Sequence, residues 1–79
     1  MQLELLPDGL DGKLLHVEEE CAEVIHAICK ARRFGLASSH PREPEKGNNY
    51  QRLLTELEQL KDAILRLDAE LDDLAEEDT

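Results

Sequence analysis

One leucine-rich stretch decides the fold: residues 50–74 read YQRLLTELEQLKDAILRLDAELDDL. Its large apolar residues alternate steps of four and three across three heptads, at positions 53, 57, 60, 64, 67, 71 and 74. This spacing lines them along one face of an α-helix, and Asn48 or Asn49 can cap the first turn. We therefore expect a helix over residues 49–75, followed by an acidic tail over residues 76–79.

A second amphipathic segment precedes this stretch. Residues 12–34 contain no Pro, and no Gly beyond the first position. Their apolar residues fall within an arc of about 100° on a helical wheel; these are Leu14, Val17, Cys21, Val24, Ile25 and Ile28. Basic residues suit the C-terminal end, and Gly35 can take a left-handed cap. We expect a helix over residues 12–34, between a leader (residues 1–11) and a polar loop (residues 35–48).

Two such helices predict an all-α protein, a long αα-hairpin of two antiparallel helices. At 79 residues the chain forms one small domain, and two helices cannot enclose a core. Ala22 and Cys29 also widen the apolar sector of the first helix beyond what one partner helix covers. We therefore expect self-association into an oligomeric four-helix-type bundle, either a homodimer or a homotetramer.

Charge and composition exclude several classes of function. The chain has 19 acidic and 9 basic residues, a formal net charge of -10, which argues against binding to duplex nucleic acid or to anionic lipid. No apolar run approaches the roughly 18 residues of a membrane span, and no basic signal segment opens the chain, so we expect a cytoplasmic protein. In such a compartment Cys21 and Cys29 are expected to be reduced. Residues 68–79 hold seven acidic and no basic residues, and we expect them to fray.

Two polar pairs flank the packing faces. Glu20 and Glu23 are three residues apart on the first helix, and Glu56 and Gln59 repeat that spacing on the second. The first residue of each pair lies about 40° from the apolar stripe, and the second about 60° further out. Carboxylates that converge across a seam repel unless a cation joins them, and oxygen ligands suit Mg²⁺ or Mn²⁺. A metal site is one interpretation, and an ordinary solvated face of charged residues is the other.

The same residues carry a resemblance to a known family. Residues 15–27, LHVEEECAEVIHA, with KARRFG at residues 30–35, closely resemble the metal-binding helix of MazG-like nucleoside triphosphate pyrophosphohydrolases, and the short phage and prophage forms above all. Residues 49–57, NYQRLLTEL, look like the lead-in to the second acidic motif of that family. The resemblance covers residues 13–67 and implies an all-α, oligomeric enzyme.

The resemblance also implies a chemistry. The family holds Mg²⁺ between an ExxE helix and an ExxD helix, and it cleaves a nucleoside triphosphate to the monophosphate and pyrophosphate. Glu20 and Glu23 match the first pair, and Glu56 matches the first position of the second. The expected cofactor is therefore Mg²⁺ (or Mn²⁺), with Glu19 as a candidate catalytic base or supporting carboxylate. The candidate substrate-binding residues, drawn from the basic cluster around the loop, are Lys30, Arg33 and Arg52.

Two departures from the family pattern leave other functions open. Gln59 stands where the family has Asp, so the expected metal site lacks one negative charge but keeps a carbonyl oxygen. The family usually has a further helix that helps to hold the nucleotide, and here an acidic tail follows instead. The alternatives are a non-catalytic acidic helical interaction protein and a family member that binds nucleotide without turnover. The sequence indicates no preferred base or sugar.

Overall fold

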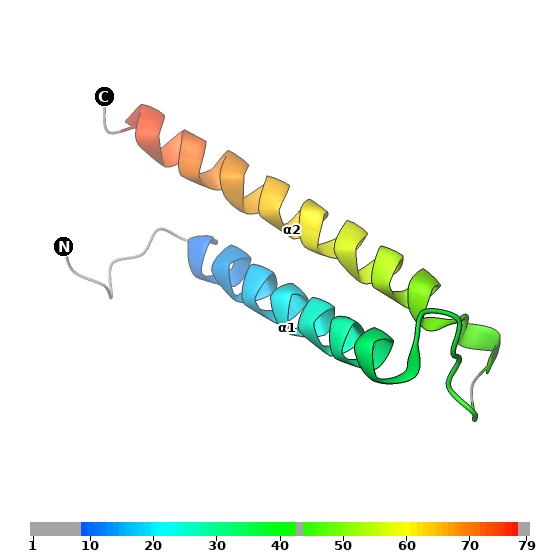
Figure 1. Ribbon diagram of the computed structural model, residues 1–79. Coiled ribbons are helices and arrows are strands. Elements are labelled where there is room, and N and C mark those ends of the chain that lie inside the picture. Colours follow the sequence, from blue (N-terminus) through cyan, green and yellow to red (C-terminus); the bar gives the residue numbers. More distant parts are fainter. Residues whose placement is uncertain (1–8, 43, 78–79) are drawn as a thin grey trace.

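The computed structural model describes residues 9–42 and 44–77, which form two long helices (Figure 1). Helix α1 covers Leu10–Phe34, a short 3₁₀ turn η2 covers Pro44–Lys46, and helix α2 covers Asn49–Glu77. The two helices lie side by side and antiparallel in a molecule of 52 × 20 × 19 Å. The predicted all-α class and the αα-hairpin are confirmed, and the described residues include no β-strand.

Helix α1 begins earlier than the sequence predicted, at Leu10 instead of residue 12. Gly9 precedes it with a φ of +87°, a left-handed conformation that glycine adopts without strain. The carbonyl of Gly9 accepts the backbone N–H of Lys13 at 3.2 Å and so closes the first turn. Residues 10 and 11 of the predicted leader therefore belong to the helix, and residues 1–8 lie outside the described part of the chain.

Helix α2 stays helical through its acidic segment. Residues 68–75 are helical, as the predicted bounds require, and the helix continues through Glu77, two residues into the predicted acidic tail. Near this end the ammonium of Lys13 lies 3.3 Å from a carboxylate oxygen of Glu70 and links the two helices. Leu67 and Leu74 also remain half-buried. An ion pair between the helices and continued apolar spacing explain why negative charge alone does not end the helix.

Asn48, one of the two predicted caps, begins helix α2. Its side-chain oxygen accepts the backbone N–H of Gln51 at 2.9 Å, and the Gln51 side-chain oxygen accepts the backbone N–H of Asn48 at 3.0 Å. This reciprocal pair is a capping box, which satisfies two N–H groups that the helix start leaves without intrahelical partners. Gly47 leaves room for it, since a Cβ at that position would lie 2.5 Å from the Gln51 side-chain oxygen.

Asn49, the other predicted cap, joins the two helices instead. It is 8% exposed, and its amide nitrogen donates to the carbonyls of Gly35 at 2.9 Å and Lys30 at 3.4 Å. Both carbonyls lie at the end of α1, and that of Gly35, which follows the last helical residue, has no intrahelical partner. The backbone N–H of Asn49 also donates to the carbonyl of Ser38 in the connection at 2.8 Å. Asn49 thus fixes the start of α2 against the end of α1.

The face through which the helices pack is shifted from the predicted apolar stripes. The buried apolar side chains are Leu10, Val24, Ala27 and Ala63, and Ala63 is only 1% exposed. The distance between packed helices depends on the side chains at the contact. The small side chains of the two alanines let the helices approach each other there, so the contact is centred near these residues. Ile25 and Ile64, which belong to the predicted stripes, are left 61% and 45% exposed.

The hairpin therefore has a thin core of its own. No large side chain in the described residues is fully buried, and Cys21 and Cys29 are both free and exposed, although we expected Cys21 within the packing stripe. A domain of this size needs an additional source of stability, such as association. Neither helix, over its described length, is long and apolar enough to cross a membrane.

Candidate functional site

Glu20 and Glu56 lie deeper in the helix contact than the sequence predicted. Both residues are half-buried, and the Oε2 atom of each is enclosed with no hydrogen-bond partner among the described residues. The contact is shifted toward Ala27 and Ala63, and this shift turns the two carboxylates inward from the edge of the seam. An enclosed carboxylate oxygen without a partner is unfavourable, and a cation or a hydrogen-bond donor relieves it.

Glu23 and Glu56 line one small cavity between the helices. The other residues around it are His26, Ala27, Lys30 and Arg52. Two carboxylates from different helices and two basic side chains therefore meet at one place. The structure thus brings together two of the predicted metal ligands and two of the predicted substrate-binding residues, and we refer to this place as the Glu23–Glu56 cavity.

Glu20 and Gln59 do not line the Glu23–Glu56 cavity. Glu23 lines it from α1, and Glu20 is three residues, or about 4.5 Å of helix rise, further toward the start of that helix. Gln59 is exposed to solvent. Within the described residues, no group of three or more His, Cys, Asp or Glu side chains could hold a metal ion. In the described part of one chain, the cavity brings together two of the four expected ligands, Glu23 and Glu56, and the set of four stays a prediction.

The remaining acidic candidates lie apart from the cavity. One carboxylate oxygen of Glu20 lies 3.8 Å from Nε2 of His16, one turn earlier on the same helix. Glu19 is exposed and does not line the Glu23–Glu56 cavity. The role of Glu19 as a base stays a prediction of the family resemblance.

The cavity has a volume of only about 10 Å³, room for one bare ion or one water, and it is lined by residue types that bind divalent cations and phosphates. Mg²⁺ usually keeps several waters and binds proteins through one or two carboxylates together with substrate phosphates. Glu23 and Glu56 supply two carboxylates, and the partnerless oxygen of Glu56 is the kind of atom that such an ion ligates. By this rule two carboxylates are enough protein ligands for Mg²⁺ that is also bound to phosphate.

Lys30 and Arg52 extend from the cavity into a second pocket of about 210 Å³ at the closed end of the hairpin. Its other lining residues are Phe34, Ser38, Ser39, His40, Pro41 and Asn49. Among the described residues, no carboxylate lies within ion-pair distance of Lys30 or Arg52. Two cationic side chains without carboxylate partners suit an anion with several oxygens, such as a phosphate chain.

Sequence reasoning did not identify the loop side of this pocket. Ser38, Ser39 and His40 belong to the connection, and they meet Lys30 and Arg52 only because the chain folds back between the two helices. No spacing in the sequence marks such a meeting. The one usable signal is the concentration of basic residues on both sides of the loop.

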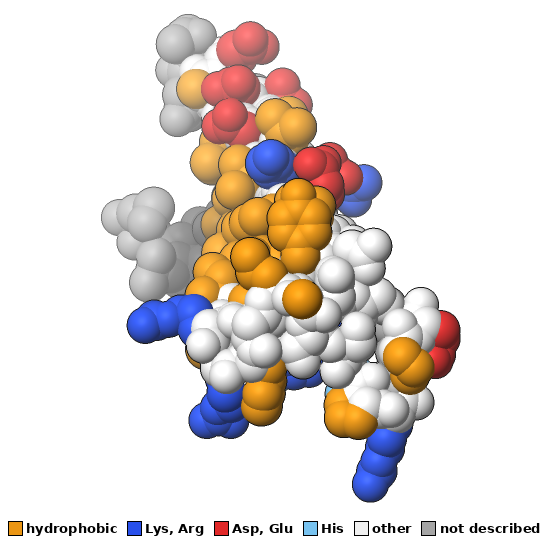
Figure 2. Space-filling model, turned by 45° about the vertical axis from the view of Figure 1, so that its right-hand side comes forward, with side chains coloured by type: hydrophobic (Ala, Val, Ile, Leu, Met, Phe, Trp, Pro, Cys, Tyr) orange, Lys and Arg blue, Asp and Glu red, His pale blue; other side chains and the backbone are white. Residues whose placement is uncertain are grey.

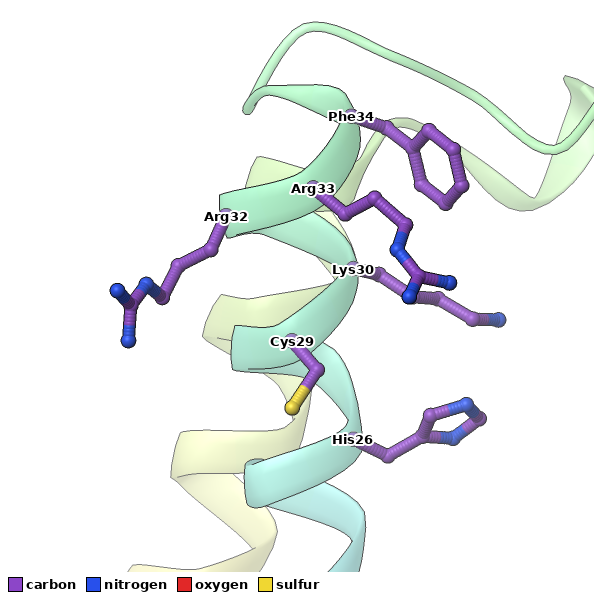
Figure 3. Close-up of a pocket in the computed structure, with 6 residues that line it drawn as sticks. All are labelled: His26, Cys29, Lys30, Arg32, Arg33 and Phe34. Atoms are coloured by element: carbon purple, nitrogen blue, oxygen red, sulfur yellow. The ribbon is translucent and has the colours of Figure 1, made fainter.

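A third pocket of about 600 Å³ lies at the end of α1 (Figure 3). Figure 3 shows His26, Lys30, Arg33 and Phe34 extending to the same side of the helix and Arg32 to the opposite side. The guanidinium of Arg33 lies 5.9 Å from the centre of the Phe34 ring, a cation–π contact. Arg33, a predicted substrate-binding residue, therefore lies beside the Glu23–Glu56 cavity and does not line it.

Comparison with known proteins adds no further assignment. The chain matches no family model, no curated protein and no solved structure. Its function must therefore be argued from the residues and their arrangement, and the MazG-like resemblance stays a hypothesis that the motifs carry.

Proposed function

We propose that the protein hydrolyses a nucleoside or deoxynucleoside triphosphate to the monophosphate and pyrophosphate, with Mg²⁺ or Mn²⁺, as its resemblance to MazG-like enzymes implies. One observation carries the proposal: Glu23 and Glu56 line the same cavity as Lys30 and Arg52. A metal–triphosphate complex has both a cation and several anionic oxygens, so its site needs side chains of both signs. Such a substrate is consistent with a cytoplasmic location.

The roles divide between the two kinds of side chain. Glu23 and Glu56 would hold the ion, which would neutralise charge on the phosphate oxygens, and a part for Glu20 is implied by the family resemblance alone. Lys30 and Arg52 bind phosphate oxygens and direct the chain of phosphates toward the second pocket, whose wall they share. Glu19, next to Glu20 in the sequence, is the candidate for the base that orients the attacking water or for a carboxylate that supports the metal ligands.

Turnover of a panel of triphosphates tests this proposal. We expect pyrophosphate release in the presence of Mg²⁺ or Mn²⁺, and its loss in Glu23→Gln and Glu56→Gln. The matched control is Glu58→Gln, because Glu58 is a highly exposed carboxylate on the same helix that pairs with Lys61 at 3.9 Å. Release of orthophosphate instead of pyrophosphate, or equal loss of activity in the control, would contradict the assignment.

A nucleotide-binding protein without turnover is the second candidate. It is favoured by the exposure of Gln59 and by the finding that, among the described residues, only two carboxylates line the Glu23–Glu56 cavity. In that case equilibrium dialysis finds a triphosphate bound with metal, Lys30→Met weakens the binding, and no pyrophosphate is released from any substrate in the panel. The remaining alternative, a non-catalytic acidic interaction protein, would bind no triphosphate.

A further inference from the structure

The second pocket, at the closed end of the hairpin, has room for part of a ligand. Its volume is about 210 Å³, whereas pockets that enclose a whole drug-sized ligand measure about 300–1,000 Å³. It shares Lys30 and Arg52 with the Glu23–Glu56 cavity, so one molecule can reach from the cavity into it. The two cationic side chains suit the phosphates of such a molecule, and the other walls of the pocket indicate what the rest of it is.

The closed end attracts anionic ligands, although the chain as a whole is acidic. Residues 30–52 hold six of the nine basic residues and only two acidic ones, in a chain of net charge -10. Figure 2, in which the closed end comes forward, shows basic side chains projecting around that end and acidic side chains gathered at the far end. A local excess of positive charge raises the concentration of anions near it. The second pocket is therefore placed to receive part of an anion.

Phe34 gives the second pocket an aromatic wall. It lines this pocket as well as the pocket at the end of α1, and the Arg33 guanidinium lies 5.9 Å from the centre of its ring. In Figure 3 the ring extends sideways from the last turn of α1. Phe34 is 61% exposed, so its ring remains open to a ligand. Flat aromatic groups stack favourably on such a ring.

The loop side of the second pocket offers hydrogen-bonding atoms of both kinds. Nδ1 of His40 accepts the backbone N–H of Arg42 at 3.1 Å, so in the neutral ring the proton is on Nε2, which is left as a donor. Asn49 donates through its amide nitrogen to two main-chain carbonyls, and its side-chain oxygen remains an acceptor that no donor among the described residues takes. The hydroxyls of Ser38 and Ser39 can donate or accept. The pocket therefore suits a group whose edge carries both donors and acceptors.

A nucleobase combines a flat ring with an edge of donors and acceptors, whereas a phosphate chain has neither. We propose that the second pocket holds the base of the nucleoside triphosphate, with its ring stacked on Phe34 and its edge bound by His40 and Asn49. This assignment rests on the proposed function, because Lys30 and Arg52 join the pocket to the cavity that takes the metal and the phosphates. The triphosphate then runs from the closed end of the hairpin toward the Glu23–Glu56 cavity.

The two kinds of contact contribute differently to affinity and to selectivity. Stacking on an aromatic ring tolerates any base, because every base has a π-face, so Phe34 contributes to the affinity for all triphosphates. Hydrogen bonds to the edge of the base depend on its pattern of donors and acceptors, so His40 contributes to the choice among bases. We therefore expect Phe34→Ala to weaken the binding of all triphosphates, and His40→Ala to change their order of affinity.

Inorganic tripolyphosphate separates the base pocket from the phosphate site, since it carries the phosphates without a base. Equilibrium dialysis with Mg²⁺ compares its binding with that of non-hydrolysable analogues of a panel of nucleoside triphosphates. We expect the wild type to bind the preferred analogue at least about tenfold more tightly than tripolyphosphate, because only the analogue has a base to stack. Phe34→Ala should lose at least about fivefold in affinity for each analogue, while its affinity for tripolyphosphate stays unchanged.

Leu36→Ala is the matched control for Phe34→Ala. Leu36 is 50% exposed at the same end of the hairpin, and it lines neither the second pocket nor the Glu23–Glu56 cavity, so all affinities should stay at their wild-type values. Phe34→Tyr keeps an aromatic ring and should retain the preference for the analogues. Should Phe34→Ala fail to fold, Phe34→Leu takes its place, because leucine keeps apolar volume without a π-face.

The outcomes separate this assignment from the proposed function. Equal affinity of the wild type for tripolyphosphate and for every analogue would overturn the base pocket and leave the proposed function standing. So would a Phe34→Ala variant whose affinities for the two kinds of ligand are both unchanged or equally weakened. An unchanged order of the analogues in His40→Ala would overturn the part given to His40. If neither tripolyphosphate nor any analogue binds the wild type, the proposed function fails, and the base pocket fails with it.

Discussion

The two long sides of this hairpin differ in which side chains the contact between the helices buries. On one side, the small side chains of Ala27 and Ala63 let the contact extend toward Glu20 and Glu56, so that one carboxylate oxygen of each is shielded from solvent. On the other side, large apolar residues such as Ile25 stay outside the contact. An off-centre contact therefore produces both a charged cavity and an apolar surface from two ordinary amphipathic helices.

The difference shows that helix packing, and not the apolar stripe alone, decides what is buried. A single partner helix covers only part of a wide apolar sector. Here the partner helix covers the small residues at the edge of the sector, and the larger apolar residues stay exposed. Three substitutions test this off-centre contact.

Enlarging the side chain at the centre of the contact should have the largest effect. Ala63→Leu adds volume at a position that is 1% exposed, so it pushes the helices apart or turns them toward the apolar side. We expect the free energy of unfolding to fall by about 1–3 kcal/mol in urea titrations at fixed protein concentration. Ala69→Leu is the control, because Ala69 is exposed on the same helix. Equal stabilities of the two variants would show that the contact does not centre on Ala63.

Removing the amide that joins the two helices should have an intermediate effect. Asn49→Ala leaves the carbonyls of Gly35 and Lys30 without their donor, and we expect a loss of about 1–2 kcal/mol in the free energy of unfolding. Hydrogen exchange should rise first at the end of α1. Thr55→Ala, whose hydroxyl bonds only to the carbonyl of Gln51 in its own helix, should change stability by less than about 0.5 kcal/mol. Equal losses in both variants would mean that Asn49 does not fix the closed end.

Restoring the carboxylate of the family pattern should have the smallest effect. From the sequence alone, Gln59→Asp is expected to tighten Mg²⁺ binding, because an ionised oxygen is a better ligand than an amide carbonyl. Since Gln59 is exposed and does not line the Glu23–Glu56 cavity, we expect a gain in affinity of no more than about threefold. A much larger gain, measured by calorimetry, would place Gln59 at the metal in the assembled protein.

The sequence was sufficient for the parts of the molecule that local chemistry controls. Helical periodicity predicted both helices, Asn48 was one of the two residues predicted as the cap of the second, and the hairpin followed from the polar segment between the helices. The lengths of the helices were less well predicted. The turn at Gly9 and the ion pair between Lys13 and Glu70 depend on contacts that no local pattern specifies.

The rotation of each helix about its axis could not be predicted from the apolar stripes. Ala27 and Ala63 contribute little to an apolar stripe, yet they set the contact. For the same reason the sequence placed Glu20 and Glu56 at the edge of the seam instead of within it. It also could not show that Ser38, Ser39 and His40 return to Lys30 and Arg52, because that depends on the path of the connection.

The direct test of the central claim is the binding of Mn²⁺ with a non-hydrolysable triphosphate analogue, followed by electron paramagnetic resonance. If the Glu23–Glu56 cavity holds the metal and Lys30 and Arg52 hold the phosphates, the wild type should bind the two ligands cooperatively. Glu23→Gln and Glu56→Gln should each weaken Mn²⁺ binding about tenfold or more, Arg52→Met should weaken the analogue, and Glu58→Gln should leave both unchanged. Equal Mn²⁺ affinity in the wild type and Glu56→Gln would contradict the claim.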